Sequence, residues 1–586
     1  MNYSLKKYDA KDIKNLDSLG LVKRFSIYLS GEGLKLSLAI LNILINSVAN
    51  IATPLILGYA IDHFITHKNL LGLTNYAVIL TLLYVIISIT QYLQTKTMGT
   101  IGQDVLFRLR RDVFNKIQSL PLAFFNQNKL GDLISRINND TDKLNQFFSQ
   151  SLNQFVGNIF IIIGIGVFIF FINPKLALIT IISAVVLIFI TYLISPWISK
   201  RNRLSLQALG GLSAEIQESL NNFKVIVSFD RRDYFRENSN RANEENFSAS
   251  VKSGIANNIS APLYDLSGNI ASILVLFFGI SMIVQGQLTI GTLVSFLSYT
   301  DKFYSPLRQM AAIWSNAQTS LAAWNRILEI LNLKSNLEVL PHLKTEPTKH
   351  IMRFRDVSFA YTKKKILHHV SFTFDKGKTY AIVGPTGGGK STIASLMSRL
   401  YDPLKGEVHF EGRDIRTFDP QELSQKIGFI LQDQFIFTGT VGENIAYGNP
   451  TYSAYSKDKL EKELEELDLS ILVKKFENGL DTQVTPNTEL ISLGQKQLIS
   501  FLRAIIRKPE LLIMDEATAN IDTITEALLQ KIIDKLPEST TKVIIAHRFN
   551  TIKKADEIFF VNEGKVISAE SYEKSLELIK QSKRKS

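Results

Sequence analysis

One glycine-rich segment has the residue types and the spacing of a phosphate-binding loop. Residues 384–391 fit the pattern G-x-x-x-x-G-K-[ST], between an apolar strand-like stretch at 379–383 and an apolar helical pattern. Glycines let backbone N–H groups close on phosphates at a helix N-terminus, while Lys390 reaches the terminal phosphates and Ser391 can bind Mg²⁺. The predicted phosphate-binding residues are Gly384, Pro385, Thr386, Gly387, Gly388, Gly389, Lys390, Ser391 and Thr392.

Two adjacent carboxylates form a second candidate for chemistry. The apolar run 511–514 ends in Asp515 and Glu516, which is typical of a buried strand whose carboxyl end reaches a nucleotide. We expect Asp515 to bind Mg²⁺ and Glu516 to act as general base on the attacking water. ATP and Mg²⁺ are therefore the predicted ligands.

Composition indicates a chain that is partly in lipid. Of 586 residues, 46% are hydrophobic and 20% charged, which excludes a disordered chain, and the length requires more than one domain. The net charge is +12, and residues 351–586 hold 34 basic and 32 acidic residues, so most of the excess lies in the apolar first half. A basic excess between apolar runs is typical of cytoplasmic membrane loops. We predict no nucleic-acid partner, because no basic patch alternates with aromatic residues. The absence of cysteine excludes disulfides and a thiol nucleophile.

Long uncharged runs predict six membrane helices. Four runs are each long enough to span a bilayer, and a fifth is divided at residues 285–287, which favours a hairpin of two spans. The runs are 36–61, 70–95, 144–173, 176–199 and 266–300.

The connections between these runs predict the topology. The long connections 96–143 and 200–252 hold 8 and 9 basic residues, which places them in the cytosol with both termini. Their helical period indicates that the helices extend into the cytosol. We predict a cytosolic segment at 1–33, a membrane domain at 34–330, a linker at 331–350 and an α/β domain at 351–586.

Taken together, these motifs resemble the ATP-binding cassette (ABC) exporters, and the resemblance covers nearly the whole chain. It implies a half-transporter in the cell membrane, with six membrane helices fused to one cytoplasmic nucleotide-binding domain. It also implies that Tyr361 stacks on adenine, that Gln432 contacts Mg²⁺ and water, and that His547 contacts the γ-phosphate. Asp522 resembles the loop that crosses to the opposite site. In this family, ATP lies between two such domains, so a second half-transporter is the expected partner.

The family signature Leu-Ser-Gly-Gly-Gln is altered in this chain. The matching residues are Ile491, Ser492, Leu493, Gly494 and Gln495, so that a leucine replaces one glycine. Ser492, Gly494 and Gln495 would meet the partner's ATP, and the side chain at 493 would hinder close approach. A backbone conformation restricted to glycine would add a cost of about 1–3 kcal/mol. The preceding stretch 484–489 also lacks the usual Gly-Glu.

The departures from the family pattern lie in the signature and in the stretch before it, and none lies in the residues that bind this chain's own nucleotide. Because the half-site from Lys390 through Glu516 to His547 is complete, the pattern resembles heterodimeric multidrug exporters, in which only one site hydrolyses ATP efficiently. The hypothesis is that this chain supplies the phosphate loop and base to the competent site. A homodimer that tolerates Leu493 is the alternative.

Polar residues in the membrane half suggest contacts or a substrate path. Asn42, Asn46 and Asn50 share one helix face, either lining a cavity or bonding a neighbouring helix. Asp265 and Arg308 lie at matching depth in two antiparallel helices, which predicts a charge pair. Three further sets are candidates: Asp301 for the cavity; Phe303, Tyr304 and Trp314 for an apolar cation or for packing; and 108–120 and 215–223 for the coupling helices.

The predicted function is ATP-driven export of small amphipathic or drug-like molecules from the cytoplasm or inner leaflet by alternating access. Export of lipid or peptide uses the same architecture and stays open. An ATP-gated channel or regulatory subunit is the alternative from another class, against which Glu516 argues.

Overall fold

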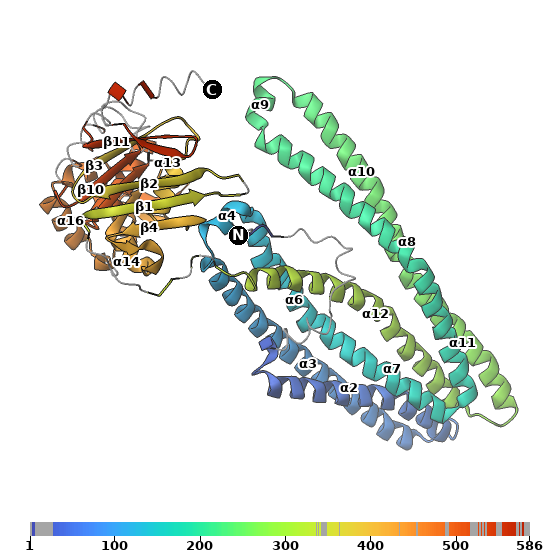
Figure 1. Ribbon diagram of the computed structural model, residues 1–586. Coiled ribbons are helices and arrows are strands. Elements are labelled where there is room, and N and C mark those ends of the chain that lie inside the picture. Colours follow the sequence, from blue (N-terminus) through green and yellow to red (C-terminus); the bar gives the residue numbers. More distant parts are fainter. Residues whose placement is uncertain are drawn as a thin grey trace. The chain divides into compact units, whose positions relative to one another are not determined.

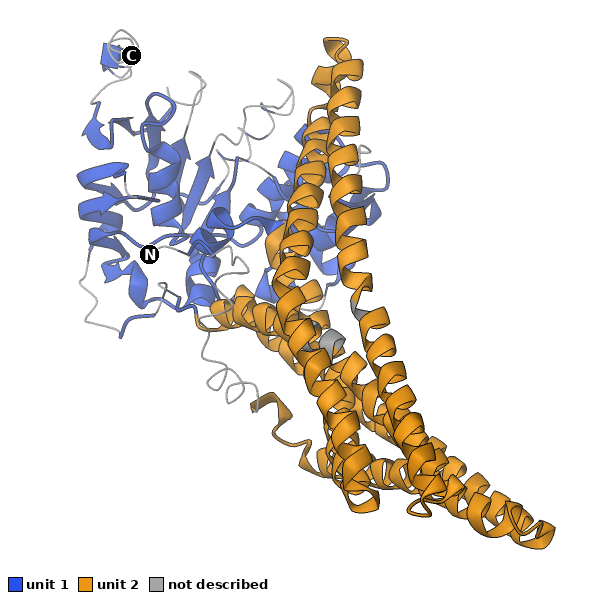
Figure 2. Ribbon diagram, turned by 90° about the vertical axis from the view of Figure 1, so that its right-hand side faces the viewer, with its two compact units in different colours: residues 1–5, 119–130, 333–586 blue, residues 6–118, 131–332 orange. Residues whose placement is uncertain are grey.

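The computed structural model consists of two compact units, which are described separately (Figure 2). The sheet unit comprises Met1–Leu5, Ser119–Leu130 and Leu333–Ser586, and the helical unit comprises Lys6–Gln118 and Gly131–Asn332. The structure describes residues 3–5, 27–335, 337, 339–341, 348–362, 364–432, 434–452, 455–486, 491–515, 526, 529, 533, 536–545, 554–569, 573–574 and 577–578.

Long helices build the helical unit (Figure 1). Helices α8 and α10 lie side by side and are joined through the short α9. Five-residue π-helical turns at Ile61–Ile65, Arg136–Asp140 and Phe147–Ser151 connect some of the α-helices. The helices are α2 (Gly33–Ala60), α3 (Leu70–Gln118), α5 (Leu130–Ser135), α6 (Thr141–Gln146), α7 (Leu152–Ile172), α8 (Pro174–Asn221), α9 (Phe223–Ser228), α10 (Arg232–Asn258), α11 (Ser260–Val284) and α12 (Ile290–Leu331).

Local capping explains two of the tight turns between the long helices. Asn173 lies between α7 and α8, and its side chain accepts hydrogen bonds from the N–H groups of Lys175 and Leu176. Pro174 follows at the first helical position, where its missing N–H costs nothing. Gly286 adopts φ +68 in the turn after α11, and Thr289 caps α12. The short connections predicted at these two places are confirmed.

The helical unit has the surface of a membrane region. Among the described residues, five helical stretches are long and apolar enough to cross a membrane, beginning at Gly33, Leu70, Leu130, Pro174 and Arg232. Their outer faces expose many large apolar side chains, which a bilayer would cover. The sixth predicted span, α12, is not one of these five, because Asp301 and Lys302 interrupt its apolar stretch.

The inner connections are helical, as predicted, although the short helices lie later in the chain than expected. Residues 108–118 are the end of α3, and a separate short helix follows, α4 (Leu122–Gln127), within the sheet unit. Likewise, residues 215–221 belong to α8, and the short helix is α9. The helical period continues through the end of each long helix, so it could not locate the turn that starts the next one.

A six-stranded sheet forms the centre of the sheet unit, in the order β12-β11-β3-β10-β9-β6. All neighbouring strands from β11 to β6 are parallel, and β12 pairs antiparallel with β11. The strands are β3 (Thr379–Val383), β6 (Ile427–Ile430), β9 (Leu511–Asp515), β10 (Thr541–Ile545), β11 (Glu557–Asn562) and β12 (Lys565–Ser568). Strands β3, β9 and β10 are almost entirely buried, which explains why most of their residues are apolar.

Smaller elements complete the sheet unit. An antiparallel sheet has the order β2-β1-β4-β5, and β7 pairs with β8. The core of this unit contains two apolar clusters. One includes Leu502 and Leu512, and the other includes Phe374 and Ile513. These strands are β1 (His350–Phe359), β2 (Leu367–Asp375), β4 (Lys405–Phe410), β5 (Arg413–Asp414), β7 (Gly439–Thr440) and β8 (Gln483–Val484). The α-helices after α4 are α13 (Lys390–Met397), α14 (Pro420–Lys426), α15 (Val441–Ala446), α16 (Lys457–Glu466), α17 (Ser470–Val473) and α18 (Leu493–Ile505), with 3₁₀ turns at Ile415–Thr417, Pro450–Tyr452 and Gly479–Asp481.

Candidate functional site

The glycine-rich loop joins β3 to α13 and has a backbone that requires glycine. Gly384 has φ +147, and a Cβ added there would lie 2.0 Å from the carbonyl oxygen of Val561 in β11. Gly389 has φ +113 and immediately precedes the first residue of α13. A side chain would be strained at both positions and would collide at the first. The loop therefore packs tightly against its own sheet.

Lys390 lies beneath this loop, at the first position of α13. Its side chain is buried, with 6% exposed, and Nζ donates to the carbonyl oxygens of Gly384 and Pro385, each at 3.0 Å. A buried ammonium group beside the N-terminus of a helix is a site for an anion. Ser391 is exposed next to it, and its hydroxyl is accessible for a ligand. The arrangement fits the phosphates of a nucleotide.

The strand register brings further predicted residues to the same edge of the sheet. Ile545 in β10 is paired with both Ile382 in β3 and Asp515 in β9. The carboxyl ends of these parallel strands therefore align with the start of the phosphate loop. Asp515 is buried, with 6% exposed. Gln432, which is exposed, follows the end of β6, the strand beside β9.

Several predicted site residues lie outside the described part of the chain. Glu516 directly follows β9, His547 comes two positions after β10, and Asp522 lies in the stretch 516–525. The unusual stretch before the signature is also undescribed at 487–490. The roles of these residues stay predictions.

Tyr361 is positioned by other aromatic residues. Its ring contacts Phe359 and Tyr401 edge-on, with centroid distances of 4.9 and 5.0 Å. The hydroxyl group donates to Oγ1 of Thr392 in α13 at 3.3 Å. This contact joins the predicted adenine-stacking residue to the helix that begins at the phosphate loop. Tyr401 was missed in the sequence, because nothing in its neighbourhood distinguishes it from a core tyrosine.

Comparison with known proteins identifies both parts of the chain. The model of the ABC transporter transmembrane region matches residues 36–307, and the ABC transporter model matches 367–519. This chain is an ABC transporter. It is 33% identical to an uncharacterised ABC transporter ATP-binding protein, YfiC, of Bacillus subtilis, over 97% of this chain and 94% of the relative.

Two further relatives carry functional names. The chain is 31% identical to a fatty acid ABC transporter ATP-binding/permease protein of Mycobacterium bovis, over 83% of this chain and 76% of the relative. It is 30% identical to YheH, a probable multidrug resistance ABC transporter protein of Bacillus subtilis, over 83% and 72%. The chain is therefore an ATP-hydrolysing exporter protein, with a multi-pass membrane region and a cytoplasmic ATPase domain.

The signature segment of this ABC transporter begins α18. The Ser492 side chain accepts a hydrogen bond from the Gln495 N–H at 3.2 Å, and Oε1 of Gln495 accepts one from the Ser492 N–H at 2.8 Å. This reciprocal pair is a capping box, which fixes the first turn of the helix. Because the serine oxygen accepts the backbone bond, its own O–H remains able to donate.

Leu493 does not adopt the glycine-only conformation considered from the sequence. It is the first helical residue of α18, and its φ is not positive. The condition for a backbone cost is therefore not met at this position, because a helical backbone accepts a leucine without strain. The side chain itself is 48% exposed on the surface. The predicted hindrance at this position could then come only from the bulk of the side chain, and it stays a prediction.

In the helical unit, the predicted charge pair is confirmed. Nη1 of Arg308 in α12 lies 2.7 Å from Oδ1 of Asp265 in α11. The prediction depended only on counting 1.5 Å per residue inward from the turn at 285–288. Both side chains are partly exposed.

The asparagines of α2 make contacts of two kinds. Asn42 bonds the Leu38 carbonyl of its own helix, whereas Nδ2 of Asn46 bonds Oγ1 of Thr90 in α3 at 3.0 Å. Asn50 donates to Oδ1 of Asn46 at 2.9 Å. The helix-bonding interpretation is therefore correct for Asn46.

Lys302 extends this network and was missed in the sequence. Its Nζ donates to the main-chain oxygen of Asn50 at 3.0 Å and to Oδ1 of Asn50 at 3.1 Å. The position of Lys302 within a membrane segment could have indicated such a contact, because a charged side chain there needs a polar partner. Of the two adjacent charged residues, only Asp301 was considered in the sequence. Asp301 is exposed, as a cavity residue would be.

The aromatic candidates of α12 divide between packing and the undescribed part of the chain. Phe303 and Tyr304 are buried in an apolar cluster, and the Tyr304 hydroxyl donates to the Thr180 carbonyl at 3.1 Å. They pack the helices, as one of the two interpretations predicted. The side chain of Trp314 lies outside the described structure.

Proposed function

We propose that the chain is half of an exporter that moves amphipathic or drug-like molecules out of the cytoplasm or the inner leaflet by alternating access. The observation that carries the proposal is the fusion of a membrane region to an intact phosphate loop with a buried lysine. A fatty acid relative and a probable multidrug relative support an amphipathic substrate. In this proposal, 1–33 is a cytosolic segment, 34–330 the membrane domain, 331–350 a linker and 351–586 the nucleotide-binding domain.

The nucleotide would be held by residues from several elements. Tyr361 stacks on the adenine ring, the loop N–H groups and Lys390 bind the phosphates, and His547 contacts the γ-phosphate. Glu516, directly after β9, takes the proton from the attacking water. Binding by both halves closes the domains, and hydrolysis reopens them.

The oxygen donors at the edge of the sheet fit Mg²⁺. Ser391 supplies a hydroxyl, Gln432 an amide oxygen and Asp515 a buried carboxylate, and hard divalent cations prefer such ligands. Mg²⁺ neutralises phosphate charge when it is bound. These three residues would hold the ion and orient it toward the phosphates.

We propose that the working transporter contains a second half-transporter chain, different from this one. This chain then gives its phosphate loop to one site, while Ser492, Gly494, Gln495 and the segment of Asp522 complete the weaker site. The exposed Leu493 supports this proposal, because its bulk lies where the partner's ATP would approach. A homodimer is the alternative.

ATP turnover by the purified chain alone distinguishes these assemblies. The rate is measured in nanodiscs, with Glu516→Gln as the control. We expect very slow turnover in a folded chain that still binds ATP. Robust turnover that depends on Glu516 would show that two copies form working sites, and would exclude an obligate heterodimer.

Transport is tested in inside-out vesicles that contain the chain and its partner. Hoechst 33342 and a pyrene-labelled fatty acid represent the drug-like and the lipid-like substrate. We expect uptake of at least one probe that requires ATP and stops when ATP is removed. Flux that outlasts ATP removal would instead support a channel, and lack of uptake of both probes would contradict amphipathic export of this kind.

A further inference from the structure

The short helix α4 is too small to hold its position alone. It has six residues, Leu122–Gln127, and isolated helices of this length are unstable in water. Phe124 anchors it with a fully buried ring, at 0% exposure. On another side, Nδ2 of Asn126 donates to the hydroxyl of Tyr401 at 2.7 Å. Because burial raises the pKa of Tyr401, this hydroxyl stays protonated and neutral.

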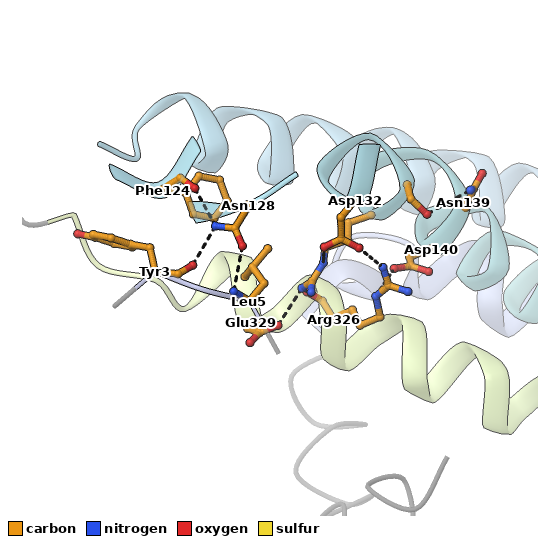
Figure 3. Close-up of polar contacts among 11 residues, drawn as sticks. Tyr3, Leu5, Phe124, Asn128, Asp132, Asn139, Asp140, Arg326 and Glu329 are labelled. Carbon is orange, nitrogen blue, oxygen red and sulfur yellow. Dashed lines mark hydrogen bonds and ion pairs between the residues drawn. The ribbon is translucent and has the colours of Figure 1, made fainter. Parts of the chain in front are cut away.

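A single side-chain amide then joins the end of α4 to the segment 3–5. Asn128 follows the last residue of α4, and its Nδ2 donates to the carbonyl oxygens of Phe124 at 2.7 Å and Tyr3 at 2.9 Å. Its Oδ1 accepts a hydrogen bond from the Leu5 N–H at 3.0 Å. The amide thus pairs with the segment 3–5 as a peptide group of a neighbouring strand would (Figure 3).

Tyr3 makes this contact a specific one. Its side chain is 2% exposed, and its N–H donates to Oε1 of Gln127 at 2.7 Å. The hydroxyl donates to the carbonyl oxygen of Lys334 at 3.1 Å, three residues after the end of α12. One buried tyrosine therefore contacts both α4 and the chain that leads from α12 into the sheet unit.

We propose that Tyr3 and Leu5, together with Gln127, Asn128 and Lys334, form a clasp that positions α4. The chain passes between the two units at 5/6, 118/119, 130/131 and 332/333, so each crossing lies beside α4 or close in sequence to a residue of the clasp. Through the Asn126–Tyr401 contact, α4 is also joined to the aromatic ring beside Tyr361. The clasp keeps α4 in a fixed orientation, so that movement of the sheet unit is transmitted to α3.

The consequence for transport rests on the proposed function, because it assigns α4 the role of a coupling helix. Tyr3 is a positioning residue, since it is not part of the nucleotide site. Loss of the clasp should leave ATP binding intact. It should reduce the amount of transport obtained for each ATP hydrolysed.

The contact itself is tested first, in a background without cysteine. Leu5→Cys with Asn128→Cys should form a disulfide on mild oxidation in the full chain, whereas either single variant should not. In amide hydrogen exchange, Tyr3→Ala and Asn128→Asp should each raise exchange in residues 119–130 about 10-fold. Lys129→Ala, which changes an exposed side chain next to Asn128, should not change it. The β3 peptide 379–383 reports whether the sheet unit remains folded.

Asn128→Asp is the more specific of the two variants, because it changes only the hydrogen-bond donor of the side chain. It keeps the acceptor for the Leu5 N–H but places a carboxylate against the carbonyl oxygens of Tyr3 and Phe124. Absence of the disulfide, or unchanged exchange in 119–130 in both variants, would overturn the clasp. Neither measurement depends on a substrate or on the proposed function.

The functional arm uses the ratio of Hoechst 33342 or pyrene fatty acid uptake to ATP hydrolysis. We expect Tyr3→Ala to lower this ratio at least 3-fold, and Lys129→Ala to leave it unchanged. In a Tyr3→Ala chain that also carries the cysteine pair, oxidation should restore the ratio, which a merely structural role would not produce. An unchanged ratio in Tyr3→Ala, with exchange raised, would overturn the coupling role. No uptake of either probe by the native transporter would contradict the proposed function and also the coupling role that rests on it, while leaving the clasp to be decided by the first two measurements.

Discussion

The phosphate loop and the signature segment are both glycine-containing starts of helices, yet they are built differently. In the phosphate loop, Gly384 and Gly389 have positive φ, and Gly384 lies against the backbone of β11. In the signature, Leu493 has an ordinary helical backbone and an exposed side chain. The first glycines are required by the chain's own packing, whereas the glycine missing at 493 would matter only to a partner.

This difference explains where the family pattern is kept and where it changes. A side chain at Gly384 would disturb the packing of the chain itself, because it would collide with the backbone of β11. Substitution at 493 leaves α18 and its capping box intact, and its cost depends on what approaches the surface. The altered signature is therefore compatible with the fold of this chain.

The largest expected effect is that of Gly384→Ala. Strain at φ +147 together with the contact to Val561 should weaken ATP binding about 100-fold, equivalent to about 3 kcal/mol. Gly387→Ala is the matched control, because Gly387 has φ +80 but nothing within 4 Å of an added Cβ. It should cost about 10-fold or less. Binding of a fluorescent ATP analogue to the purified chain measures both, and equal losses would show that close packing against β11 is unimportant.

The next largest effect is expected for Leu493→Gly, which tests the signature segment. If bulk alone prevents close approach, the turnover of the purified chain should rise about 10-fold, which corresponds to about 1.4 kcal/mol. Leu493→Ala should give an intermediate rate, because a methyl group is smaller than the leucine side chain. Unchanged rates in both variants would show that the weak site has another cause, such as the altered stretch before the signature.

Sequence was sufficient for the features fixed by local pattern. The phosphate loop follows from the spacing of its residues, and the buried strands and the long helices follow from their apolar patterns. The Asp265–Arg308 pair follows from the rise per residue of a helix. Each of these depends on residues near in sequence or on one regular geometry. For the same reason, the fold class and the presence of an ATP-binding domain could be predicted.

Contacts between distant segments could not be predicted. Tyr3 bonds residues more than 120 and 330 positions away, and Lys302 bonds Asn50 through a helix crossing whose angle no local pattern specifies. The backbone conformation at 493 could also not be predicted from the residue type. A glycine in the signature can be required either for a positive φ or because a ligand needs the space of a side chain. The short helix α4 could not be located, because the apolar period of α3 continues through the candidate segment 108–118.

A smaller effect is expected at Tyr361, which belongs to the well-packed half-site. Tyr361→Ala should weaken ATP binding about 5-fold, because stacking on a base contributes about 1 kcal/mol or more. Tyr361→Phe should remain within about 2-fold, since it loses only the 3.3 Å contact with Thr392. Titration with the same ATP analogue measures both variants. A large loss in the phenylalanine variant would mean that the hydroxyl, through α13, positions the phosphate loop.

The smallest effect separates the two roles of Ser492. Ser492→Ala removes the cap of α18, a loss of about 1 kcal/mol, and should raise amide exchange in the first turn of α18 about 5-fold. Ser492→Asp can still accept the bond from the Gln495 N–H but has no proton to donate, so exchange should stay near that of the native chain. Both variants lose the hydroxyl proton that faces outward, so both should slow ATP turnover in the assembled transporter if a partner's phosphate accepts it. If only the alanine variant is slower, Ser492 acts through α18 alone, and the signature would then resemble the phosphate loop in serving its own chain's structure.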